Sequence, residues 1–284
     1  VLPPSIILIF FALEAGVPTG DLFLASFIPG FMLASFYIIY IIVRCYLDPS
    51  KGPPRKKEDI PPLNERIKLL KKLLAPGLIA LWIMVSIYGG IATVTETAAT
   101  GALAALLIGI KRKKVNFKFL KDCLSYTLSV TGRLFWLTMG STSLIGVFSI
   151  MGATAYLKSM VLGLPFEPLG IVLTMMGILV ILGMFMDWIG ILLLTSPIFV
   201  PIIIQLGFSP IWYGVLFSLN MQVSFVSPPF GPACFYIKSV APPEISILDI
   251  FKGVLPFMLL QILAITIVIM YPDIALFLPN WMNK

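Results

Sequence analysis

The sequence predicts an all-α polytopic membrane protein, and its composition, its apolar stretches and its prolines support that prediction. Of the 284 residues, 59% are hydrophobic and 12% are charged. Soluble globular proteins have about 45–50% apolar and about 25% charged residues. Several apolar stretches are long enough to cross a hydrocarbon core of about 30 Å, and others are interrupted by prolines. Whole helices together with interrupted ones are typical of membrane transporters.

Residues 211–241 predict a re-entrant helical hairpin. No charged residue lies between Ile211 and Ile237, yet Ser227-Pro228-Pro229 interrupts the stretch. Proline has no N–H and clashes with the preceding turn, so a continuous helix is not expected here. Each flank has about 12–15 apolar residues and a helical length of about 18–22 Å, which is too short to span alone. We therefore expect two half-helices that meet at a Ser-Pro-Pro tip, where free main-chain groups bind a solute or an ion.

The start of the chain repeats this construction. Val1-Leu2-Pro3-Pro4 aligns with Val226-Ser227-Pro228-Pro229. After a short slip, Pro29-Gly30-Phe31-Met32-Leu33 aligns with Pro256-Phe257-Met258-Leu259. Paired interrupted segments predict an inverted-repeat transporter whose binding site lies at the two tips. The first tip therefore adds Pro3, Pro4 and Ser5 to the candidate site residues.

The repeat divides the chain into two parts. Residues 1–75 are expected to be the end of a first repeat, and residues 76–284 a second one. The first part would hold the second half of hairpin one, a span over 22–46, a basic linker over 47–66 and an amphipathic helix over 67–75. That last helix either lies at the membrane surface or begins the next span. Because the second repeat has about 150 residues before its double proline, a fragment of that size is expected to be missing before Val1.

Residues 76–110 carry one charge, Glu96, and are divided by Gly89-Gly90 and by Thr93-Val94-Thr95-Glu96-Thr97. They predict either one broken spanning helix or a second re-entrant element. The positive-inside rule favours re-entry, because it places the basic linker and the basic run over 111–114 on one side.

The remaining stretches predict ordinary membrane helices. Residues 116–160 predict an interfacial piece up to about Leu128, followed by a separate span rich in Gly, Ser and Thr. Spans are expected over 169–186, 188–206 and 254–272.

Two carboxylates in apolar surroundings are candidates for ion binding. Asp187 interrupts GMFMDWIGILLLTSPIFVPIII, and Glu96 lies among threonines. A carboxylate within the membrane costs roughly 3 kcal/mol on insertion scales, so such residues are usually retained for function. The structural alternatives are a helix N-cap at Asp187 and a first-turn carboxylate at Glu96 that the helix dipole favours.

The tips, the break over 89–97 and Asp187 together suit a sodium ion and an organic anion. Hydroxyl and carbonyl oxygens coordinate small alkali cations, and half-helix N-termini attract carboxylates. Asn220 and Ser224 lie one turn apart and either line this path or only hold helices together. The sodium candidates are Thr93, Thr95, Asp187 and Ser227. The full candidate set is Pro3, Pro4, Ser5, Gly89, Gly90, Thr93, Thr95, Glu96, Thr97, Asp187, Asn220, Ser224, Ser227, Pro228 and Pro229.

Several classes of function are not expected. The chain has no histidine, so it has no Ser-His or Cys-His pair, and no phosphate-binding Gly-Lys loop is present. Cys45, Cys123 and Cys234 are too scattered for a disulfide framework or a metal site. The net charge of +7 lies mostly in two runs, which indicates membrane topology rather than nucleic-acid binding. We expect no enzyme activity and no cofactor beyond sodium as a coupling ion.

Several motifs, in order, resemble one transporter family. GGIATVTETAATGALAALLIG resembles the Gly-Gly-Ile-x-Thr-Pro-Thr-Glu-Ala-Ala segment of the large membrane (M) subunit of tripartite ATP-independent periplasmic (TRAP) transporters. GMFMDWIGILLLTSPIFVPI resembles its Gly-Met-Phe-x-Asp-Pro segment, LPPSI and SPPFG resemble its two hairpin tips, and KSVAPPEISILDIFKGVLPF resembles the segment before its last helix. The likeness covers the chain as the C-terminal two-thirds of that subunit. Val94 and Trp188 stand where the family usually has proline.

The resemblance implies an elevator-type secondary transporter in the bacterial inner membrane. It implies sodium-driven uptake of a carboxylate that a periplasmic binding protein delivers, and a small four-helix Q subunit as partner. A stand-alone anion transporter of similar inverted-repeat architecture and a membrane scaffold subunit without a solute path stay open as alternatives. By the same likeness, site roles are carried to Pro3, Pro4, Ser5, Thr93, Thr95, Glu96, Asp187, Asn220, Ser227, Pro228 and Pro229.

Overall fold

The computed structural model describes residues 1–53, 62–229 and 231–282, and within these residues the secondary structure is entirely helical. The chain folds into two compact units. Unit 1 comprises residues 1–37 and 134–284, and unit 2 comprises residues 38–133. Helices α2 (Thr19–Leu47) and α5 (Phe117–Ile150) each begin in one unit and end in the other. The predicted all-α fold is confirmed.

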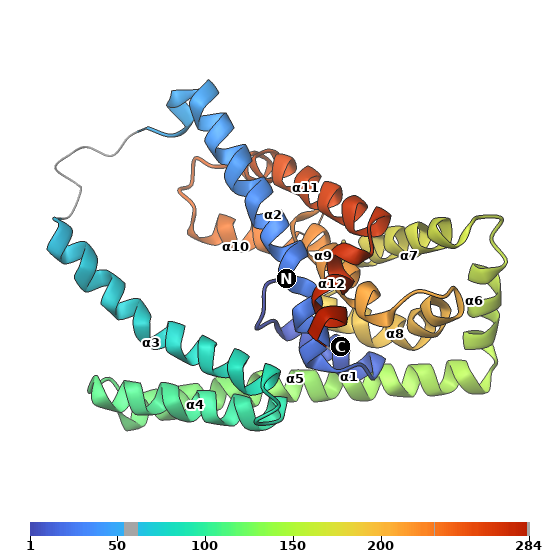
Figure 1. Cartoon of the computed structure of the whole chain (residues 1–284), viewed down its shortest axis with the longest axis horizontal. Coiled ribbons are helices and arrows are strands. Elements are labelled where there is room, and N and C mark those ends of the chain that lie inside the picture. The colour runs from blue at the N-terminus through green and yellow to red at the C-terminus, as the bar shows by residue number, and fades with distance from the viewer. Residues whose placement is uncertain (54–61, 230, 283–284) are drawn as a thin grey trace. The chain divides into compact units, whose positions relative to one another are not determined.

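Unit 1 holds most of the described helices, which Figure 1 labels. Besides the start of α2 and the end of α5, they are α1 (Ile6–Ala15), α6 (Ala153–Leu162), α7 (Pro168–Gly183), α8 (Trp188–Gln205), α9 (Pro210–Val226), α10 (Pro232–Val240), α11 (Ile247–Met270) and α12 (Asp273–Met282).

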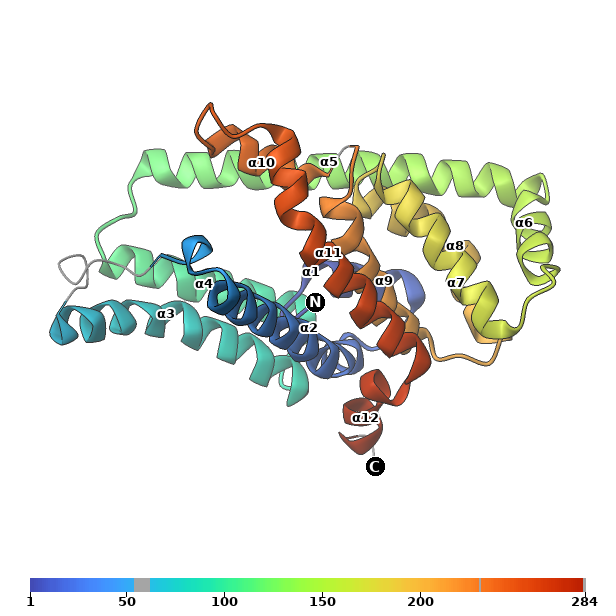
Figure 2. The ribbon, with the colours of Figure 1, turned by 90° about the horizontal axis from the view of Figure 1, so that it is seen from above.

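Helix α9 is the centre of unit 1. It contacts α1, α7, α8, α10, α11 and α12, and Figure 2 shows it next to α11, with α7 and α8 beyond it. Its sequence carries no charge, so every face can be buried, and Trp212, Tyr213 and Phe217 are almost fully enclosed. The Trp212 indole donates a hydrogen bond to the carbonyl of Val268 on α11 at 2.8 Å, which satisfies the one polar atom that this ring buries.

A glycine sets how closely α9 approaches its neighbours. A Cβ on Gly214 would lie 2.6 Å from Cε1 of Phe11 and 2.8 Å from Cδ1 of Leu22. The absence of a side chain therefore lets α1 and α2 pack directly on the α9 backbone. Small residues serve this purpose in membrane helices because packing, rather than a hydrophobic force between helices, drives their association.

Unit 2 contains an antiparallel helical hairpin. Helix α3 (Leu63–Tyr88) packs along α4 (Val94–Lys111), as Figure 1 shows. The Trp82 indole donates to the Thr100 hydroxyl at 3.0 Å, and Gly101 lies against Ile83. The structure thus shows α3 and α4 as a helix pair that turns back on itself, and the choice between a broken span and a re-entrant element for residues 76–110 stays a prediction. The 3-10 turn η1 (Pro49–Lys51) also belongs to this unit.

Five helices within the described residues are long and apolar enough to cross a membrane: Thr19–Leu47, Val94–Lys111, Phe117–Ile150, Trp188–Gln205 and Ile247–Met270. The span expected over 169–186 is shorter in the structure. Helix α7 stops at Gly183 after 16 residues, or about 24 Å, because residues 184–187 form the loop that leads into α8.

Two further predictions concern residues 116–160 and residues 67–75. The interfacial piece and the separate span predicted over 116–160 are one helix, α5, up to Ile150, and α6 follows. Polarity changes along α5, but it contains no proline to break it. The segment over 67–75 is part of α3, so it begins the next helix. The amphipathic pattern itself rests on side chains of Lys68, Leu69, Lys71 and Lys72, which lie outside the described residues, as does the linker part over 54–61.

Candidate functional site

Hairpin two breaks where the sequence predicts. Helix α9 ends at Val226, Ser227 takes an extended conformation, and α10 begins at Pro232. The Pro228–Pro229 peptide bond is cis. The N–H of Gly231 donates to the Ser227 carbonyl at 2.8 Å. The two chain directions therefore meet at a compact tip rather than in a continuous helix.

Side chains on both sides hold this tip. The Ser227 hydroxyl is buried, donates to the Val223 carbonyl at 2.7 Å and lies 3.3 Å from the Met258 sulfur on α11. The Cys234 thiol on α10 reaches back to the Val226 carbonyl at 3.7 Å. The hydroxyl that the sequence nominates for sodium is thus engaged with its own helix, and its sodium role stays a prediction.

The first tip has the same local order. Pro3 and Pro4 are joined by a cis peptide bond, Ser5 is extended, and α1 starts at Ile6 without a side-chain cap from Ser5. Helix α2 passes close by, since a Cβ on Gly30 would lie 2.7 Å from Cδ2 of Leu2. The equivalence of the two halves as repeats stays a prediction.

Two cavities in unit 1 lie near these tips. One, of about 360 Å³, is lined by Ile7, Tyr37, Trp188, Met221, Gln222, Phe225, Val226 and Gln261. The other, of about 350 Å³, is lined by Val1, Leu2, Gly30, Leu33, Ala34, Tyr37 and Gln222. Tyr37 and Gln222 line both, so the two cavities are neighbours. The four tip prolines line neither of them, so a binding cavity between the two Pro-Pro corners stays a prediction.

Three polar side chains of this space escaped the sequence analysis. Gln222 lies on α9, Tyr37 on α2, and Gln261 on α11. Gln261 is 7% exposed, and its Oε1 has no hydrogen-bond partner among the described residues. A signal was available, because Gln261 interrupts the long apolar run of α11 and an amide at such a depth needs partners.

Asn220 and Ser224 lie on a different face of α9. The Asn220 amide donates to the carbonyl of Met176 on α7 at 2.9 Å, and the Ser224 hydroxyl donates to the Asn220 carbonyl at 3.2 Å. A Cβ on Gly183 of α7 would collide with Ser224. This face is packed against α7, and Asn220 and Ser224 line neither of these two cavities, an arrangement that matches the helix-holding alternative.

Asp187 lies next to hairpin two. It occupies the N-cap position of α8, but its side chain makes no capping hydrogen bond and is exposed. A cavity of about 250 Å³ is lined by residues 183–187 and by Pro232, the first residue of α10. The carboxylate therefore borders the same cavity as a helix N-terminus, where the macrodipole carries partial positive charge. In this conformation the Asp187 side chain does not cap α8, which was the structural alternative for this residue.

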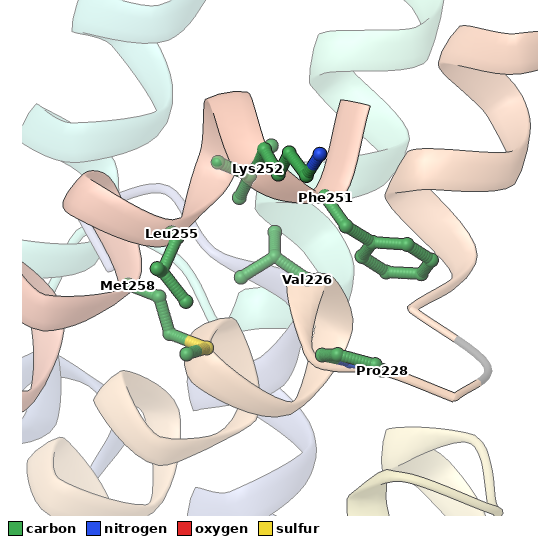
Figure 3. Close-up of a pocket in the computed structure, with 7 residues that line it drawn as sticks. Val226, Pro228, Phe251, Lys252, Leu255 and Met258 are labelled. Atoms are coloured by element: carbon green, nitrogen blue, oxygen red, sulfur yellow. The ribbon is translucent and has the colours of Figure 1, made fainter. Parts of the chain in front are cut away.

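A further cavity, of about 160 Å³, separates the second tip from α11. Figure 3 shows Val226 from the end of α9 and Pro228 from the tip, with side chains of α11 around the same space: Phe251, Lys252, Leu255 and Met258. Its walls are almost wholly apolar, so it provides room beside the tip rather than ligands for an ion.

The remaining candidates belong to unit 2. Glu96 and Thr93 form a capping box, because the Thr93 N–H and hydroxyl donate to Glu96 Oε2 at 2.8 and 2.7 Å and the Glu96 N–H donates to Thr93 Oγ1 at 3.3 Å. Glu96 is exposed and is thus a first-turn carboxylate, the structural alternative. Thr97 is fully buried, and its hydroxyl has no partner among the described residues.

Two glycines form the break between α3 and α4. Gly89 ends α3, and Gly90 has φ 62, a conformation that glycine adopts without strain. Gly89, Gly90, Thr93, Thr95, Glu96 and Thr97 lie in unit 2, and the other candidates lie in unit 1. A joint site of both groups stays a prediction.

The interrupted helices and the five helices that are long and apolar enough to span indicate an integral membrane protein of the transporter class. Comparison with known proteins gives the family. Residues 1–274 match the family described as "Tripartite ATP-independent periplasmic transporter, DctM component", and the chain belongs to it. This is a family of transporter permease subunits and not of enzymes, which confirms the suspected resemblance.

Relatives of known name support this assignment. The chain is 29% identical over 282 residues to the large permease protein of an ectoine TRAP transporter of Halomonas elongata, covering 98% of this chain and 64% of the relative. It is 27% identical over 281 residues to the permease protein of a sialic acid TRAP transporter of Haemophilus influenzae, covering 98% and 44%. It is 27% identical over 283 residues to the large permease protein of a C4-dicarboxylate TRAP transporter of Pseudomonas aeruginosa, covering 99% and 65%. The chain thus spans less than two thirds of the length of these relatives.

Proposed function

We propose that this chain is the permease part of a sodium-coupled secondary transporter that takes up a small organic carboxylate. A periplasmic binding protein delivers the solute, and a small four-helix membrane subunit completes the complex in the bacterial inner membrane. The relatives are named for ectoine, sialic acid and C4-dicarboxylates, so the family handles more than one solute and the binding protein would select among them.

The observation that carries this proposal is a pair of neighbouring cavities beside two interrupted helices. They share Tyr37 and Gln222; one is lined by Val1 and Leu2 next to the first Pro-Pro corner, and the other by Phe225 and Val226 at the end of α9. In transporters, solutes and coupling ions bind where interrupted helices face such a cavity. A membrane scaffold subunit would have no need for it.

The location of Asp187 supports the coupling ion and the anion. Its carboxylate suits a sodium ion, and the N-terminus of α10, which borders the same cavity, suits the carboxylate of a solute. Neutralisation of one charge by the other would let both enter a region from which either alone is excluded.

Reconstitution of the complete complex in liposomes tests the proposal. The solute is first identified by mass spectrometry of the purified binding protein. We expect its uptake to require both an inward sodium gradient and the binding protein. Equal uptake in potassium would refute sodium coupling, and uptake without the binding protein would favour a stand-alone transporter.

A scaffold without a solute path predicts a different outcome. Transport by the complete complex would then be unchanged by Asp187→Ala and by Ser227→Ala. We expect both variants to lose uptake while the complex still assembles, as judged by co-purification of its subunits.

A further inference from the structure

The junction of α4 and α5 concentrates positive charge. Six cations occur between residues 111 and 121, and all of their side chains are exposed. None of them forms an ion pair within the described part of the chain, where the salt bridge that is seen joins Lys51 and Asp48. We call this segment the basic elbow; its cations are Lys111, Arg112, Lys113, Lys114, Lys118 and Lys121.

The backbone of the elbow is firmly hydrogen-bonded. The N–H groups of Arg112, Lys113 and Lys114 donate to the carbonyls of Ile108, Ile110 and Gly109 at 3.0, 2.8 and 3.1 Å. Across the turn, the Asn116 side chain accepts from the Phe119 N–H at 2.7 Å and starts α5. The cations are therefore held on an ordered turn between two helices and are not carried by a loose tail.

Two local features of the elbow disfavour its cations. Lys113 has φ 53, the left-handed conformation in which helices usually end on glycine because a Cβ is strained there. Lys118 lies in the first turn of α5, where the positive end of the helix dipole repels a cation. The dipole of α4 explains a cation in its last turn, but it explains neither Lys113 nor Lys118. An anion outside the chain would explain both.

Apolar side chains accompany the charge. Phe117, Leu120 and Leu124 recur at the spacing of one helix face and are 85%, 36% and 68% exposed. A helix start that carries bulky apolar residues together with lysines is typical of a segment at a membrane surface. A soluble acidic partner would leave these apolar side chains in water, so the combination favours a lipid.

We propose that the basic elbow binds the phosphate headgroups of anionic phospholipids, while Phe117, Leu120 and Leu124 enter the boundary of the acyl chains. This inference does not depend on the solute or on the coupling ion, because it concerns a different part of the chain. Basic residues immediately beside a membrane helix attract anionic lipids with about 1 kcal/mol each, which corresponds to about fivefold in affinity.

Native mass spectrometry of the purified protein in detergent tests the proposal with two lipids, phosphatidylglycerol and phosphatidylcholine. We expect phosphatidylglycerol to be retained in preference. The double variant Lys118→Gln, Lys121→Gln should bind it about 25-fold more weakly. The matched control Arg133→Gln, Lys252→Gln removes two exposed charges elsewhere and should change the affinity less than twofold.

Lys113→Gly separates lipid binding from folding. Glycine relieves the strained φ, so the melting temperature should stay the same or rise, whereas phosphatidylglycerol affinity should fall about fivefold. Equal retention of both lipids, or an equal loss in the control pair, would overturn the proposal. So would elbow variants that keep phosphatidylglycerol but no longer co-purify with the small membrane subunit, because the occupant would then be that protein.

Discussion

The two helical hairpins of this chain are built from different turn chemistry. Hairpin two, α9 and α10, is broken by consecutive prolines, which have no N–H to satisfy. The turn from α3 to α4 uses glycines and a capping box instead. There the N–H groups of Gly89, Gly90 and Ile91 all find carbonyls of α3, and Thr93 and Glu96 satisfy each other.

A break in a membrane helix leaves main-chain groups free for a ligand only where the turn does not satisfy them itself. The turn after α3 satisfies most of its own main-chain groups, so an ion there would rely on side chains such as the buried Thr97 hydroxyl. Hairpin two is bordered by cavities on several sides.

The largest effect is expected at the centre of unit 1. Gly214→Val places methyl groups where a Cβ already lies 2.6 Å from Phe11, and the backbones of α9 and α1 must separate. We expect a loss of about 3 kcal/mol of stability, measured by thermal unfolding in detergent. The control is Gly140→Val, since nothing lies within 4 Å of a Cβ at Gly140; a similar loss there would contradict the packing argument.

The second prediction concerns the carboxylate of Asp187. If Asp187 binds sodium, the complete complex should be stabilised by about 2.7 kcal/mol at a sodium concentration 100 times Kd. Asp187→Asn should remove this response and leave stability in potassium unchanged, because the side chain makes no cap. Melting curves in the two salts measure it. A full sodium response in the variant would exclude Asp187 as a ligand.

A third contrast concerns the two polar faces of α9. Asn220→Leu leaves the Met176 carbonyl without its donor and should cost about 2 kcal/mol of stability. Gln222→Leu changes a side chain that lines the cavities, so it should reduce uptake and leave the melting temperature nearly unchanged. The reverse pattern, with Asn220 affecting only uptake, would place the transport path on the α7 side.

The smallest effect is expected at the start of α4. Thr93→Ala removes the N-cap hydroxyl that accepts from Glu96 and should destabilise the first turn by about 1 kcal/mol. Faster hydrogen exchange of the amides over 94–97 would report it. Thr95→Ala, at an exposed position in the same turn, serves as the control and should exchange as the unmodified chain does.

Local rules predicted the breaks well. The end of α9 follows from Pro228 and Pro229, and the turn before α4 follows from Gly89 and Gly90, because these residues act on the backbone directly. Continuity was harder to predict. In α5 the polarity changes near Leu128, but polarity decides where a helix lies and not whether it ends.

The lining of the candidate site could not be predicted from periodicity. Helix α9 is enclosed by neighbours all round, so its apolar pattern does not say which face borders a cavity. Asn220 and Gln222 are both polar. Only the packing of the helices shows that Asn220 bonds to α7, whereas Gln222 lines the cavities. Likewise, the residue type at Asp187 indicates charge, but its closeness to α10 depends on long-range packing.

The enclosure of α9 has a mechanical consequence. Helix α9, which leads into the second tip, is joined to α11 through Trp212 and Ser227 and to α7 through Asn220, while Gly214 brings its backbone against α1. A displacement of that tip would therefore take α1, α7, α9 and α11 with it as one rigid body, and a small flap that opens by itself would first have to break these four connections.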